Sequence, residues 1–141
     1  ETATMKGTFA GYKNCNLLIL RTTEKDLVFR VGVIFEHDKS WELLSSKYFS
    51  LKQMLTKKYG KPSYCVEEFD NPYQPEDDNM KMFYTEQDKC KYVTEYETDE
   101  GAITLRIVHT KAEYEHICWV MLVYNDKKNN VAEMESASDD L

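Results

Sequence analysis

Residues 40–62 read SWELLSSKYFSLKQMLTKKYGKP, and this stretch decides the fold class. Six large apolar residues recur in it at spacings of three and four, the periodicity of one helix face. These residues are Trp41, Leu44, Tyr48, Leu51, Leu55 and Tyr59. Ser40 can cap the first turn, Gly60 can end the helix, and Pro62 prevents its continuation. The stretch therefore predicts one long helix, from about residue 40 to residue 59.

The segments on both sides of this helix alternate apolar and polar residues, which is the pattern of half-buried β-strands. Strands are expected at residues 5–12, 16–22, 26–36, 63–69, 90–97, 102–109 and 116–124. The last of these is apolar on both faces, as is typical of a central strand that is covered on both sides. Lys13 and Asn14 are expected in the first turn, and Gly101 could supply positive φ in the turn at 98–101.

A second, shorter helix is expected over about residues 76–87. Pro75 suits its first position, and the acidic residues that follow suit the positive end of the helix dipole. Its apolar face would consist of Met80, Phe83 and Tyr84. Together these elements predict a two-layer α+β domain, with the long helix on one face of an antiparallel sheet of five to seven strands.

Length and charge limit the class of protein. The chain has 141 residues, and the pattern predicts one domain over residues 1–125 followed by a polar, acidic tail over 126–141. A net charge of −7, with 18 basic and 25 acidic residues, argues against nucleic acid as a partner because a phosphate backbone requires clustered basic residues. No apolar run approaches the roughly 20 residues of a membrane-spanning helix.

The four cysteines form an even set, which an oxidising compartment could join in three ways. They are Cys15, Cys65, Cys90 and Cys118, and none belongs to a CxxC pair. Buried free thiols are the other interpretation, since free cysteine behaves as a small apolar residue. The chain begins at Glu1, as it would after removal of an export signal or at an arbitrary boundary.

Three segments carry a resemblance to a known group of proteins. They are the helix with its KYGKP ending at 58–62, GAITLRI at 101–107 and VYND at 123–126. In these segments the chain resembles small exported proteins of gut Bacteroidota. The resemblance implies export to the periplasm or cell surface and an α+β fold with a helix on an antiparallel sheet. It implies no activity, and no functional residue is carried over from it.

Two candidate metal sites have simpler interpretations. The acidic residues of 67–78 could bind Ca²⁺, but the alternating EF-hand loop is absent and a solvated turn explains the same charge. Cys90 is expected opposite His109, with His116 and Cys118 on one face of the last strand. This arrangement could hold zinc or a Cys–His nucleophile, but a register slip of one residue would separate these side chains. Neither a metal nor another cofactor is therefore predicted.

Aromatic side chains are the remaining candidates for a site. Tyr73, Tyr92 and Tyr96 could contact a protein or a glycan partner, although tyrosine at the rim of a core is the more common arrangement. No nucleotide loop or hydrolase elbow is present, so the sequence favours a non-catalytic exported binding module. Two alternatives remain: a small hydrolase or ligand-binding protein with an unrecognised pocket, and a homodimeric structural subunit. The sequence leaves the partner, the oligomeric state and the oxidation of the thiols open.

Overall fold

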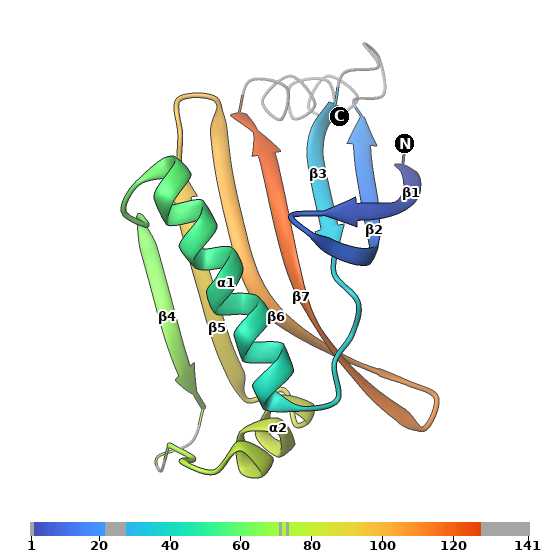
Figure 1. Ribbon diagram of the computed structural model, residues 1–141, viewed down its shortest axis with the longest axis vertical. Helices are drawn as coiled ribbons and strands as arrows, with labels where there is room; N and C mark the ends of the chain where they lie inside the picture. The colour runs from blue at the N-terminus through green and yellow to red at the C-terminus, as the bar shows by residue number, and fades with distance from the viewer. Residues whose placement is uncertain (1, 22–27, 71, 73, 128–141) are drawn as a thin grey trace, which may run out of the picture.

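The computed structural model describes residues 2–21, 28–70, 72 and 74–127 (Figure 1). The described residues form two helices, α1 (Trp41–Tyr59) and α2 (Asp78–Glu86). The strands are β1 (Thr2–Phe9), β2 (Tyr12–Arg21), β3 (Val28–Ile34), β4 (Tyr64–Phe69), β5 (Cys90–Glu97), β6 (Gly101–Ala112) and β7 (Glu115–Asp126). The predicted α+β class with one long and one short helix is confirmed.

All seven strands form one antiparallel sheet in the order β1-β2-β3-β7-β6-β5-β4. Strand β7 lies at its centre, between β3 and β6, as its apolar character on both faces predicts. Cys118, Val120 and Leu122 of β7 are buried on the face that carries α1. The side chains between them point to the opposite face and are half-buried.

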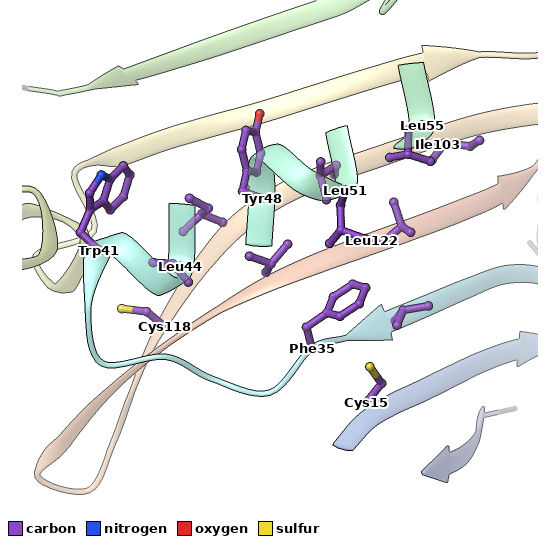
Figure 2. Close-up of a cluster of buried hydrophobic side chains, with 14 of the residues drawn as sticks. Cys15, Phe35, Trp41, Leu44, Tyr48, Leu51, Leu55, Ile103, Cys118 and Leu122 are labelled. Carbon is purple, nitrogen blue, oxygen red and sulfur yellow. The ribbon is translucent and has the colours of Figure 1, made fainter. Parts of the chain in front are cut away.

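Helix α1 buries the stripe that its sequence predicts. Trp41, Leu44, Tyr48, Leu51 and Leu55 point toward the sheet, where Trp41 packs on Tyr92 of β5 and the helix contacts β6 and β7 (Figure 2). Ser40 accepts a hydrogen bond from the Leu43 amide, and the Gly60 amide donates to the Thr56 carbonyl with φ at 88°. The helix therefore begins and ends where local chemistry places its termini, and its last turn defines one edge of the site described below.

Two local predictions are wrong. The first turn lies at Ala10 and Gly11, both with positive φ, and not at Lys13 and Asn14, which belong to β2. Gly11 adopts this conformation without steric cost, which makes it the better turn residue. Helix α2 begins after Asp77, whose side chain accepts hydrogen bonds from the Asn79 and Met80 amides, so Pro75 does not occupy its first position.

The buried face of α2 also differs from the prediction. Met82 and Thr85 are buried, whereas Met80 and Phe83 are exposed. Tyr84 is half-buried and packs on the core, so the sequence pattern of this short helix predicts only part of its buried face. Asp126 is the last residue of β7, and the rest of the expected tail, beyond Lys127, lies outside the described residues. Neither described helix is long and apolar enough to cross a membrane.

Candidate functional site: an apolar groove beside α1

An open cleft of about 350 Å³ lies where α1 ends above the sheet. Its apolar lining comes from β3, β6, β7 and the last residue of α1, and we call it the α1–β3 groove. Its main apolar residues are Phe29, Val31, Tyr59, Ile103 and Tyr124. Because Gly60 stops the helix at Tyr59, no further helical turn covers these sheet residues. The groove has the size and the lining of a site for an apolar anchor group.

A few polar groups border the α1–β3 groove. Arg30 donates from Nε to Oδ1 of Asn125 at 2.6 Å, so its guanidinium is held by a side chain of the neighbouring strand. Burial raises the pKa of the Tyr124 hydroxyl, and the nearby Tyr59 adds to this effect. Glu100 is exposed in the turn between β5 and β6 and also lines the groove. The groove is thus apolar at its floor and acidic at this end.

The aromatic residues predicted from the sequence lie elsewhere. Tyr96 is buried under α1, where its hydroxyl contacts the Thr56 hydroxyl and the Lys52 carbonyl. Tyr92 is half-buried and packs edge-on against Trp41 and other rings of the core. These two residues lie on the sheet face that α1 covers, and their predicted contact with a partner stays a prediction. Tyr73 lies outside the described residues.

The sequence analysis did not single out Phe29, Tyr59 or Tyr124 as site residues. The sequence predicts each of them on the apolar face of a strand or helix, where a core residue would also lie. What distinguishes them from core residues is that α1 ends above β3 and β7 and leaves them partly uncovered. The capping glycine directly after Tyr59 is the one sequence signal that could have indicated where the helical cover stops.

The histidines and cysteines form a second cluster on the α1 side of the sheet. His109 and His116 stack across the β6–β7 hairpin, with Nε2 of one ring 2.8 Å from Nδ1 of the other. Cys118 pairs with His109 in the sheet, and Cys90 lines the same small cavity of about 270 Å³ as His109. The structure brings Cys90 and His109 together as the sequence predicts.

The thiols of this cluster are poor nucleophiles. Burial raises the pKa of Cys90 to about 12, with a hydrogen bond to Thr85 opposing the shift only in part. Burial also raises the pKa of Cys118 to about 11. Since the thiolate is the reactive form, both residues stay protonated near neutral pH. Among the described residues, no three His, Cys, Asp or Glu side chains are grouped so that they could hold a metal ion.

The acidic segment is explained by structural contacts. Glu67 accepts a hydrogen bond of 2.7 Å from Lys52 of α1, and Asp77 caps α2. Both are ordinary roles for carboxylates at a helix flank and a helix start.

The face opposite α1 carries a second apolar depression. Leu18, Gly32 and Val123 lie side by side on β2, β3 and β7, with Met121 in the next row. They line a depression of about 530 Å³ that Arg106 borders. These four residues are buried or half-buried, as are the main apolar residues of the α1–β3 groove.

Fold and groove together define a two-layer α+β protein with a single antiparallel sheet and an apolar site that its long helix leaves open. No protein-family model, curated protein or solved structure matches the chain.

Proposed function

We propose that the protein is a non-catalytic interaction module, exported to the periplasm or cell surface, that binds a partner protein in the α1–β3 groove. The observation that carries this proposal is the open cleft lined by Phe29, Tyr59 and Tyr124. Aromatic rings offer large, rigid contact area at low cost in conformational entropy, and pockets of this kind receive the anchor residues of protein partners. Val31 and Ile103 add aliphatic contacts beside these rings, which suits an apolar anchor residue of a protein partner.

The histidine cluster does not favour catalysis over binding. His109 lies 4.0 Å from the carboxylate of Asp88, which is an arrangement that could orient an imidazole. The two thiols nearest to it have raised pKa values and supply no activated nucleophile at neutral pH. Export is supported by the resemblance of the 58–62, 101–107 and 123–126 segments, and the four free thiols add no argument for an oxidising compartment.

Site-specific photo-cross-linking tests the proposal. A photoreactive phenylalanine analogue replaces Tyr59 in the groove, and in a matched variant it replaces Tyr64, an exposed tyrosine on the other face of the sheet. In cells that naturally produce the protein, we expect an adduct of one defined mass in the envelope fraction from position 59 and none from position 64. Equal adducts from both positions, or none from either, would contradict binding in the groove. An adduct confined to the cytosolic fraction would contradict export alone.

A further inference from the structure

Strand β4 forms one outer edge of the sheet, and no described helix or strand lies beyond it (Figure 1). The Asp70 amide donates to the Lys89 carbonyl at 2.7 Å, in the register that β4 keeps with β5. Because successive residues of a strand direct their backbone groups to opposite sides, the N–H and C=O groups of Cys65, Glu67 and Phe69 point away from β5. These three residues therefore form the backbone edge of the sheet on this side.

The side chain of Gln74 pairs with the last residue of this edge. Its Oε1 accepts a hydrogen bond from the Phe69 amide at 2.8 Å, and its Nε2 donates to the Phe69 carbonyl at 2.7 Å. A residue of a neighbouring antiparallel strand would make the same pair of bonds, because hydrogen-bonded partners exchange both of their backbone groups. The carboxamide of Gln74 thus takes the place that one residue of an added strand would occupy.

Both bonds require a side chain that carries a donor and an acceptor together, as a carboxamide does. An ionised glutamate of the same shape would offer acceptors alone, and alanine would offer neither group. Pro75 follows Gln74 directly, and a residue before proline is restricted to extended conformations. The residue type at position 74 and the proline after it therefore both suit a fixed cap on the backbone of Phe69.

The cap leaves only a short open stretch on β4. Cys65 and Glu67 keep their outward N–H and C=O groups, for which the described part of the chain provides no backbone partner. At the other end of β4 the Ser63 amide donates to the Glu95 carbonyl at 2.8 Å, and Pro62 has no amide hydrogen. This open stretch is shorter than a typical strand of roughly 3–10 residues, so an extended segment can make only a minimal pairing with it.

Charged side chains line the same edge. Glu67 pairs with Lys52 at 2.7 Å, Glu68 lies opposite Lys91 of β5, and Asp70 is exposed just after β4. An added strand would remove water from part of these charges, so they make pairing less favourable without covering the backbone groups. At the opposite edge of the sheet, the register of β1 with β2 shifts once, and such irregularities also discourage edge-to-edge pairing.

We infer that Gln74 is an edge cap, whose carboxamide stands in for a strand residue and keeps a second copy of the chain from pairing with β4. Loss of the cap frees the backbone of Phe69 and lengthens the open stretch to Cys65, Glu67 and Phe69. Two copies can then pair antiparallel about Glu67, with Cys65 of each opposite Phe69 of the other. Glu67 faces its counterpart in this arrangement, so added salt should favour the pairing. The inference does not depend on binding in the α1–β3 groove.

Amide hydrogen exchange tests the cap itself. The natural sequence is compared with Gln74→Ala and with Gln53→Ala, which replaces an exposed glutamine of α1. In the natural sequence the Phe69 amide should exchange about tenfold or more slowly than the outward amide of Glu67. Gln74→Ala should remove this difference and Gln53→Ala should keep it. The Asp70 amide, which bonds to β5, should stay protected in every variant and so reports that β4 remains folded.

Sedimentation at about 0.5 M salt, over a range of protein concentrations, measures the association. The natural sequence and Gln53→Ala should be monomers. Gln74→Ala should form a dimer, with a dissociation constant at least about tenfold lower than that of the natural sequence. Addition of Glu67→Pro, which removes an outward amide hydrogen and no bond to β5, should restore the monomer. Glu67→Thr in the same background removes the carboxylate but keeps this hydrogen, so the dimer should persist.

Three results would overturn the inference. A Gln74→Ala protein that stays monomeric while its Phe69 amide exchanges rapidly would show that the open edge does not pair. A Phe69 amide that stays protected in Gln74→Ala would show that Gln74 is not what covers it. A dimer of Gln74→Ala that persists after Glu67→Pro is added would place the contact away from β4. The adduct from position 59 tests the proposed function separately from all three.

Discussion

The hydroxyls of Tyr48 and Thr94 lie 2.5 Å apart in the core and join α1 to β5 by a hydrogen bond. Both residues are fully buried. Burial also raises the pKa of the Tyr48 hydroxyl well above its ordinary value, so the phenol remains protonated and can donate. This bond fixes the position of α1 on the sheet, and thereby the position of the groove beside it.

Replacing Tyr48 by Phe should lower the free energy of unfolding by about 1–2 kcal/mol, because Thr94 loses its hydroxyl partner without gaining water. Urea denaturation measures this change. In a Thr94→Val background the same Tyr48→Phe substitution should cost less, since no buried hydroxyl is then left without its partner. Equal costs in the two backgrounds would show that the bond does not stabilise the fold.

Replacement of Gly101 by alanine should cost much more stability than replacement of Gly32. A Cβ atom at Gly101 would overlap the carbonyl oxygen of Asn125, so the backbone must shift, and we expect Gly101→Ala to lose about 3 kcal/mol of stability. A Cβ atom at Gly32 would meet only Leu18 Cβ at 3.8 Å, an ordinary contact, so Gly32→Ala should change stability by less than about 1 kcal/mol. Thermal denaturation of the two variants checks this prediction, and similar losses for both would contradict the close approach of β6 to Asn125.

Stability should fall above pH 9 in part through Cys118. Its pKa is raised from 9.0 to about 11 by burial, with the charge of Glu86 adding to the effect. The unfolded chain releases this proton at lower pH than the folded chain, so the stability is complete below pH 9 and is lost as the pH rises toward 11. Ionisation of the Cys118 thiol should lower the free energy of unfolding by about 1 kcal/mol between pH 9 and pH 10.

Urea denaturation at pH 8, 9 and 10 measures how the free energy of unfolding depends on pH. Cys118→Ala should be less stable at every pH because of the cavity it creates, but it should lose about 1 kcal/mol less than the natural sequence between pH 9 and pH 10. If Cys118→Ala and the natural sequence lose the same stability between pH 9 and pH 10, the Cys118 thiol must have the same pKa in the folded and unfolded states.

Thiol reactivity provides an independent measurement. All four cysteines are free in the structure, with Cys65 exposed and Cys15 and Cys118 buried. We expect an aromatic disulfide reagent to modify Cys65 rapidly in the native protein and to modify four thiols after denaturation. Cys90 and Cys118 cannot pair without backbone movement, because β6 separates their strands and places the Cα atoms roughly 10 Å apart. Zero reactive thiols in denatured protein purified without reductant would contradict the free state.

Local sequence determined the elements whose signals are short-range. Start, apolar stripe and end of α1 were all predictable because capping hydrogen bonds and the 3.6-residue period involve neighbours along the chain. The alternation of β3 and β6 and the central place of β7 followed from the same kind of local pattern. The buried face of the short helix α2 was not predicted correctly, since nine residues carry too few apolar positions to define a face.

Only the tertiary structure decided which of these residues form a site. Tyr96 and Tyr124 both lie on strands and on the same sheet face, yet α1 buries the first and stops short of covering the second. That difference depends on where a 19-residue helix lies over a seven-stranded sheet, which is set by contacts such as Tyr48 with Thr94, 46 positions apart. The sequence by itself determined the helix, the strands and their apolar faces. Packing between distant segments determined which part of an apolar face stays open, because exposure belongs to the arrangement of elements and not to any one of them.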